Sequence, residues 1–369
     1  MNVLALARPE ILAMQPYSSA RMEARGGSVL LNANEAPWPP FGDSRAWNRY
    51  PDPQPPALVD RMAALYGVAA DQLLVGRGSD EGIDLLLRAF CRAGQDAVLI
   101  SPPTFGMYAT CARVQGAAIV EAPLRADFSL DVQAVMAAVT PAVKLVFVCA
   151  PNNPTGAGVA RTAIPQLAEA LTDRALLVVD EAYVEFVAPD GLDSSVAASV
   201  GDFDNLVVLR TLSKAWALAG VRIGALIANA GVVALLRKIM PPYPLPVPSV
   251  EAALQALSRQ GEPAMRVRVT EVRQERTRMQ LALAGLPCVR AVLPSQANFL
   301  TVRFRDAEAA FAGLSNAGVV VRDVRRYQGL GDALRITIGS SAENECVLQA
   351  LRSVPGTCER ATRCEEQPA

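Results

Sequence analysis

Histidine is absent from this 369-residue sequence. Its absence excludes every site that depends on an imidazole, such as a Ser-His-Asp triad, a Cys-His dyad or an H-E-x-x-H zinc site. Any proton transfer must then use another side chain. Lysine is nearly absent as well, because only Lys144, Lys214 and Lys238 occur and arginine supplies the rest of the 35 basic residues. Each lysine can therefore be considered individually as a candidate for chemistry.

The composition also bears on partners and location. A formal charge of −1 gives no net field to attract nucleic acid or an anionic membrane, so we expect small-molecule partners. The seven cysteines never form a C-x-x-C pair, which predicts reduced thiols and no metal site. Residues 1–14 make a poor signal peptide, and the longest apolar stretch, 223–236, is too short to cross a bilayer. We therefore expect a cytoplasmic protein.

Residues 70–230 predict an α/β fold. Short continuous apolar runs alternate there with helical patterns, as in βα units on a parallel sheet that is covered on both faces. The predicted strands, each rich in Val, Leu or Ile, are Ala97–Ser101, Lys144–Cys149, Leu176–Val179 and Leu206–Leu209. Open parallel sheets bind ligands beyond the carboxyl ends of their strands, so a site is expected among the polar residues that follow these runs.

The chain is long enough for two domains. Residues 1–50 show no clear period and form an N-terminal arm, 51–248 the large domain with the mainly parallel sheet, and 249–355 a smaller α+β domain with a linking helix. A proline cluster at 241–248 marks the boundary, and 356–369 form a tail too polar to pack. The elements expected in the small domain are a helical stretch Val250–Leu283, strands Phe299–Phe304, Val319–Val321 and Leu334–Ile338, and helices from Ala307 and near Glu343–Leu351.

Lys214 differs from the other two lysines. Lys144 opens a strand and Lys238 lies in an amphipathic helix, where a solvated surface cation is usual. Lys214 follows an apolar strand in the segment RTLSKAW, which alone is explained equally well by a surface loop. Arg222 follows in GVRIG, and its planar guanidinium suits a phosphate. An imine-forming lysine and a phosphate-binding arginine together favour an aldehyde-bearing phosphate cofactor.

Polar residues at the other strand ends fit the same cofactor. Asp180 ends a buried run, where a carboxylate needs a cation or a donor; a protonated pyridine nitrogen would serve, and a helix cap is the alternative. Tyr183 can reach a hydroxyl on that ring, and so can Asn153 in APNNPTG, although that segment is also an ordinary turn. In GRGSDEG, the amides of Ser79 and Asp80 can hold a phosphate or simply begin a helix.

Tyr108, in PTFGMY, can stack on a flat ring, although an aromatic after a strand is more often part of a core.

In their order along the chain, the motifs GRGSDE, NNPTG, DEAY and SKAWALAGVR resemble those of the fold type I pyridoxal-phosphate aminotransferases. Within that superfamily, the segments PYSSAR, LNANE and RYPD are most similar to the histidinol-phosphate aminotransferase family. The resemblance extends from about residue 8 to 351, and it implies pyridoxal 5′-phosphate as cofactor and a homodimer.

The resemblance also implies a role for each matched residue. Lys214 would carry the cofactor as a Schiff base and move the proton, and Asp180 would pair with the pyridine nitrogen. Asn153 and Tyr183 would bind the ring oxygen, and Tyr108 would stack on the ring. The residues expected to bind the cofactor phosphate are Ser79, Asp80, Thr211, Ser213 and Arg222. Those expected at the substrate are Arg335, Arg322, Asn153, Tyr17 and Tyr50, the last from the neighbouring subunit.

The implied reaction is transamination between glutamate or 2-oxoglutarate and histidinol phosphate or imidazole-acetol phosphate, a step of histidine biosynthesis. One site must then accept both a carboxylate and a phosphate, which the fork of Arg335 can do. A lyase resembling threonine-phosphate decarboxylase and an aminotransferase for aromatic or aliphatic amino acids are alternatives on the same scaffold. A regulator without catalysis is disfavoured, because no basic or DNA-binding extension accompanies the domain.

Overall fold

The computed structural model describes residues 3–18, 29–40, 47–187 and 194–354. Its largest unit is a seven-stranded sheet in the order β1-β7-β6-β5-β4-β2-β3. The strands are β1 (Leu73–Gly76), β2 (Ala97–Ile100), β3 (Ala118–Glu121), β4 (Val143–Cys149), β5 (Leu176–Asp180), β6 (Leu206–Thr211) and β7 (Gly224–Ile227). Strands β2 to β6 pair in parallel, whereas β7 is antiparallel to both β6 and β1. The α/β class and the four predicted strands, now β2, β4, β5 and β6, are confirmed.

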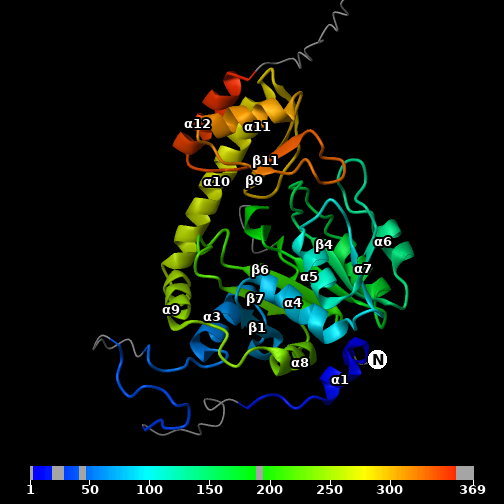
Figure 1. Ribbon diagram of the computed structural model, residues 1–369, viewed down its shortest axis with the longest axis vertical. Helices are drawn as coiled ribbons and strands as arrows, with labels where there is room; N and C mark the ends of the chain where they lie inside the picture. Colours follow the sequence, from blue (N-terminus) through cyan, green and yellow to red (C-terminus); the bar gives the residue numbers. More distant parts are fainter. Residues whose placement is uncertain (1–2, 19–28, 41–46, 188–193, 355–369) are drawn as a thin grey trace, which may run out of the picture.

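Helices cover both faces of this sheet (Figure 1). One face packs against α4 (Ser79–Phe90), α5 (Met107–Gln115) and α8 (Ala230–Ile239), and the other against α3 (Pro56–Tyr66), α6 (Val132–Ala138) and α7 (Ala163–Ala170). Along β4, Leu145 and Phe147 point toward the face covered by α4, α5 and α8, and Val146 and Val148 point toward the face covered by α3, α6 and α7. Because both faces are buried, the strand is a continuous apolar run from Leu145 to Cys149, with no polar alternation.

Short helical turns complete the large unit. The N-terminal residues, which show no period in the sequence, form a 3₁₀ turn η1 (Val3–Leu6) and a short helix α1 (Pro9–Ala13). They pack beside α8, where Lys238 Nζ donates to the carbonyl of Leu12 at 2.9 Å. The other 3₁₀ turns are η2 (Ala70–Gln72), η3 (Val184–Phe186) and η5 (Ala197–Gly201). Lys238 is thus accounted for by a structural contact.

The C-terminal unit contains a four-stranded antiparallel sheet in the order β10-β11-β9-β8. Its elements are β8 (Val289–Val292), β9 (Phe299–Phe304), α11 (Ala307–Asn316), β10 (Arg322–Asp323), β11 (Ala333–Thr337) and α12 (Ser341–Arg352). The predicted strand Val319–Val321 is wrong, because the chain leaves α11 through Gly318 at φ +75° and Val320 is 96% exposed. The strand begins only at Arg322. The predicted strands Phe299–Phe304 and Leu334–Ile338 and the helices from Ala307 and near Glu343–Leu351 are confirmed as β9, β11, α11 and α12.

The predicted helical stretch Val250–Leu283 is interrupted. It forms two helices, α9 (Val247–Ala256) and α10 (Gly261–Ala284), and α10 runs from the large unit to the small one (Figure 1). The chain turns tightly between them, since a Cβ atom on Gly261 would lie only 1.7 Å from the carbonyl oxygen of Ala256. Only glycine permits this approach, so the helical pattern in the sequence hides a break.

Two further predictions concern the ends of the chain and the membrane. The predicted tail, 356–369, lies outside the described residues. Among the described residues, no helix combines the length and the apolar character needed to cross a membrane. The domain limits at 50, 248 and 355 stay predictions.

Candidate active site

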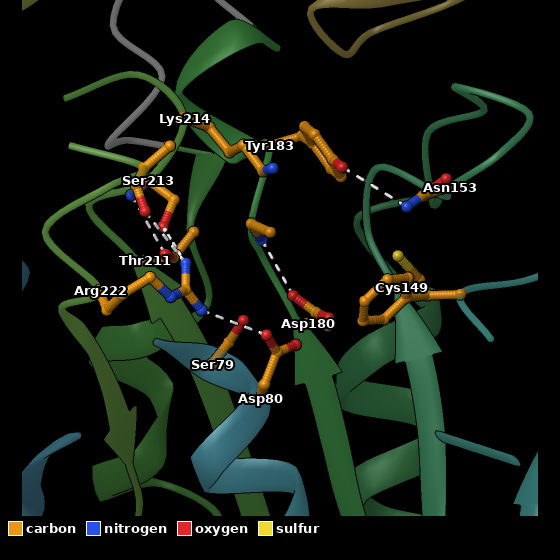
Figure 2. A pocket seen from close by; sticks show the side chains of 13 residues that line it. Ser79, Asp80, Cys149, Asn153, Asp180, Tyr183, Thr211, Ser213, Lys214 and Arg222 are labelled. Atoms are coloured by element: carbon orange, nitrogen blue, oxygen red, sulfur yellow. Dashed lines mark hydrogen bonds and ion pairs between the residues drawn. The ribbon is translucent and has the colours of Figure 1, made fainter. Parts of the chain in front are cut away.

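A pocket lies where β4, β5 and β6 end and α4 begins (Figure 2). Every residue predicted to bind the cofactor lines it, except Tyr108. The lining residues are Ser79, Asp80, Phe105, Cys149, Asn153, Asp180, Ala182, Tyr183, Thr211, Ser213, Lys214, Ala219 and Arg222. The pocket therefore occupies the carboxyl edge of the parallel strands, where the sequence predicts a site.

One corner of the pocket presents hydrogen-bond donors around a glycine turn. Gly78 has φ +86°, and a Cβ atom there would lie 2.7 Å from Nη2 of Arg222. The Arg222 guanidinium donates to Ser213 Oγ and to Asp80 Oδ2, each at 3.3 Å. Its side chain is still 48% exposed, so it can donate to a further acceptor. Beside the start of α4, this corner suits an anion such as a phosphate.

Asp180 forms the floor of the pocket and is only 3% exposed. Its Oδ2 accepts a hydrogen bond from the Tyr108 hydroxyl at 2.8 Å, and its Oδ1 accepts one from the Ala182 amide at 3.1 Å. Burial raises the pKa of Asp180 to about 6, and the hydrogen bond from Tyr108 opposes that rise. Among the described residues Asp180 has no ion-pair partner, so a cationic group in the pocket would stabilise it.

The structure places Tyr108 away from the position predicted for it. Tyr108 is fully buried, and its ring stacks on Phe147 with centroids 4.7 Å apart instead of facing the pocket. Phe105, three residues earlier, lines the pocket and meets Tyr108 edge to face at 5.5 Å. The reason is local: Tyr108 lies in the first turn of α5, on the side that packs against β4. Sequence reasoning missed Phe105, although the same motif contains it.

Lys214 follows β6 at the mouth of the pocket. Figure 2 shows its side chain reaching toward Tyr183, and its Nζ lies 5.8 Å from the centroid of that ring. Partial burial, followed by the positive charge of Arg335, lowers the pKa of Lys214. More of the amine is therefore unprotonated at neutral pH, which favours attack on an aldehyde and acceptance of a proton.

Arg335, from the small unit, reaches the pocket through Asn153. Its Nη1 donates to Asn153 Oδ1 at 2.5 Å, while Asn153 Nδ2 donates to the Tyr183 hydroxyl at 3.4 Å. The buried Nε of Arg335 has no hydrogen-bond partner among the described residues, so it can take an additional anion. Arg322 lies opposite Arg335 in the β10–β11 register, which puts a second positive charge nearby.

The two tyrosines predicted at the substrate, Tyr17 and Tyr50, do not line this pocket. Tyr17 is 69% exposed, and Tyr50 is 48% exposed and stacks on Tyr243 with ring centroids 4.3 Å apart. Arg322 is also outside the lining, although its charge acts on Arg335. The single chain thus brings together the predicted cofactor residues more completely than the predicted substrate residues.

A buried ion cluster that was not predicted from the sequence lies next to Asp180 along the chain. Arg210, on β6, donates to Glu185 at 2.7 Å and to Glu181 at 3.3 Å, and all three side chains are at most 3% exposed. Its guanidinium also lies 4.6 Å from the centroid of the Tyr66 ring. An arginine at the end of an apolar strand and two glutamates in DEAYVEF are the signals that were available. The cluster fixes the turn that follows Asp180 to the strand that precedes Lys214.

Comparison with known proteins agrees with this geometry. The family described as aminotransferase class I and II matches residues 25–351. A histidinol-phosphate aminotransferase of Xanthomonas euvesicatoria is 53% identical over 95% of this chain and 97% of its own. The crystal structure of histidinol-phosphate aminotransferase from Sinorhizobium meliloti in complex with pyridoxal-5′-phosphate aligns with a TM-score of 0.74 at 28% identity, over 83% of each chain. The structure of L-threonine-O-3-phosphate decarboxylase from Porphyromonas gingivalis aligns with a TM-score of 0.68 at 25% identity, over 83% of this chain and 92% of its own. The chain belongs to the class I and II aminotransferase family.

Proposed function

We propose that the chain is a pyridoxal-phosphate-dependent aminotransferase that moves an amino group between glutamate and imidazole-acetol phosphate, giving histidinol phosphate. The observation that carries the proposal is the convergence of Lys214, Asp180 and Arg222 on one pocket. An amine, a carboxylate and a guanidinium are the groups that the aldehyde, ring nitrogen and phosphate of this cofactor need. The 53% identical Xanthomonas relative supports the choice of substrates.

The donors around the pocket fit pyridoxal phosphate. Arg222, Ser213, Thr211, Ser79 and Asp80, the last two through their amides, would hold its phosphate at the start of α4. Asp180 would hold the ring nitrogen, because its buried carboxylate lacks a cation among the described residues. When bound, the cofactor supplies an electron sink for carbanion chemistry. Asn153 and Tyr183 would bind the ring oxygen, and Phe105 would contact the ring face.

Lys214 is the residue placed to move the proton. The chain contains no histidine, and Lys214 is the one lysine of the pocket. Its lowered pKa brings the amine closer to neutral pH, where a general base is most effective. Positioned acid-base catalysis of this kind contributes about 10²- to 10⁴-fold to the rate. Lys214 would accept a proton from the substrate carbon at its Nζ and return it to the cofactor.

Arg335 would bind the anion of either substrate. Glutamate offers a carboxylate and the other substrate a phosphate, and a guanidinium fork binds both in two-point fashion. The unpartnered Nε of Arg335 and the nearby charge of Arg322 support this role. Asn153 accepts a hydrogen bond from Arg335 and donates one to the Tyr183 hydroxyl, so it would link the substrate anion site to the residue that binds the ring oxygen.

The proposal includes a cytoplasmic homodimer in which Tyr50 of one protomer reaches the site of the other. Tyr50 is 48% exposed and does not line its own pocket, which supports a role across an interface. Tyr17 would join the substrate site in the same assembly, since it too lies outside the pocket of its own chain.

The variant Lys214→Ala tests the proposal. We expect it to lose transamination while still binding the cofactor non-covalently, because the other cofactor contacts are intact. Lys238→Ala is the control, since Lys238 contacts the carbonyl of Leu12 far from the pocket. Near-normal transamination by Lys214→Ala would contradict the assignment. Release of carbon dioxide from threonine phosphate would instead favour the decarboxylase alternative.

A further inference from the structure

The hydroxyl of Tyr108 lies beneath the pocket and has one acidic partner. It donates to Asp180 Oδ2 at 2.8 Å, and the side chain is fully buried. Burial, followed by the charge of Asp180, raises the pKa of this hydroxyl well above its ordinary value. The phenol therefore stays protonated and can only donate to the ionised carboxylate. Its ring is fixed by stacking on Phe147 at 4.7 Å.

The other groups that face Asp180 cannot replace this donor. Asp80, from α4, carries a like charge, and Lys214, beyond β6, acts on Asp180 only through its charge. Cys149 lies beside Asp180 in the β4–β5 register, but its thiol, a weak donor, already donates to the carbonyl of Pro151 at 3.4 Å. The amide of Ala182 supplies the second hydrogen bond, at 3.1 Å.

We propose that Tyr108 is a positioning residue that keeps Asp180 ionised and oriented toward the ring nitrogen of the cofactor. It acts through Asp180 and need not contact the cofactor, and the inference rests on the proposed function. A hydrogen bond to a charged group outweighs one between neutral groups, so its loss makes the buried carboxylate easier to protonate. Tyr108→Phe preserves the ring stacking and removes only the donor.

The test measures the affinity of the apoenzyme for pyridoxamine 5′-phosphate between pH 5.5 and 8.5. This probe has the ring nitrogen and the phosphate but no aldehyde, so its binding is independent of imine formation at Lys214. We expect wild-type affinity to fall as Asp180 is protonated near pH 6. For Tyr108→Phe the midpoint should move up by about one pH unit, because removing one charged hydrogen bond corresponds to a pKa change of that order.

The variant should then bind roughly threefold more weakly than wild type at pH 6.5, and equally well at pH 8.5. Tyr66→Phe is the matched control: Tyr66 is also buried, but its hydroxyl has no hydrogen-bond partner among the described residues. Its midpoint should equal that of wild type. If Tyr108→Phe is unfolded, a ring-fluorinated tyrosine at position 108, which is a stronger donor, should move the midpoint down.

A Tyr108→Phe curve that coincides with wild type, or that is weakened equally at every pH, would overturn the inference, because a purely structural role would not shift the midpoint. An unmoved midpoint with the fluorinated residue would do the same. Asp180→Asn separates this failure from failure of the proposed function. If Asp180→Asn retains wild-type affinity and pH dependence, the pairing of Asp180 with the ring nitrogen is itself wrong.

Discussion

Arg210→Met should destabilise the protein strongly and in a pH-dependent way. Arg210 is 1% exposed and pairs with Glu181, at 2% exposure, and Glu185, at 3%. Methionine fills a similar volume but leaves two carboxylates buried without their cation. Removing one partner from a buried ion pair typically costs about 3–5 kcal/mol. We expect a loss of this size in the free energy of unfolding at pH 8, measured by urea denaturation.

The loss should be smaller at pH 5. Burial already raises the pKa of Glu181, and removing the nearby positive charge raises it further. A carboxyl whose pKa is higher in the folded than in the unfolded state loses stability as pH rises above its unfolded value. Arg88→Met is the control, since its pair with Asp84 spans 3.7 Å at 47% and 45% exposure and should contribute less than about 1 kcal/mol. A loss below about 1 kcal/mol for Arg210→Met at pH 8, or a larger loss at pH 5, would show that Arg210 is not the cation that stabilises these two buried carboxylates.

Two further substitutions test the phosphate corner and the substrate anion site. A Cβ atom on Gly224 would lie 2.7 Å from the carbonyl carbon of Gly78, so Gly224→Ala should lower unfolding free energy by about 1–3 kcal/mol in urea denaturation and weaken cofactor binding. Gly201→Ala is the control, because a Cβ atom there would have no neighbour within 4 Å, and it should change the free energy of unfolding by less than about 0.5 kcal/mol. Equal losses for Gly224→Ala and Gly201→Ala would contradict the expected clash with Gly78. Arg335→Lys removes the two-point fork and the bond to Asn153, so KM for histidinol phosphate should rise roughly 10- to 100-fold in steady-state assays. A change below about twofold would argue against Arg335 as the anion-binding residue.

The sequence predicts four of the five parallel strands of the large sheet, β2, β4, β5 and β6, because these are buried on both faces. It misses β3, which lies at the edge of the sheet and is only partly buried. The runs Leu145–Cys149 of β4 and Leu176–Val179 of β5 are continuous and apolar, and the residues that follow them locate the pocket. The direction of β7 has no such signal, since an antiparallel strand with both faces buried is equally apolar. The break at Gly261 is also hidden, because a single glycine in a charged helical pattern does not reveal that the chain turns there.

The sequence identifies some residues of the site and misses others. Lys214, Asp180 and Arg222 lie at strand ends, so chemistry and position both identify them. Whether Phe105 or Tyr108 lines the pocket depends on which side of the first turn of α5 packs against β4. The amino-acid composition of the motif does not determine that side. Arg335 meets Asn153 across 182 residues, a contact that only the packing of the two units produces.

A half-reaction followed by the cofactor absorption spectrum tests directly whether the enzyme transaminates histidinol phosphate. The pyridoxal form of the wild-type protein is mixed separately with histidinol phosphate, glutamate, phenylalanine and threonine phosphate. We predict rapid conversion to the aminated form with histidinol phosphate and with glutamate, and slow conversion with phenylalanine. Preferential reaction with phenylalanine, or decarboxylation of threonine phosphate without conversion by histidinol phosphate, would contradict the account.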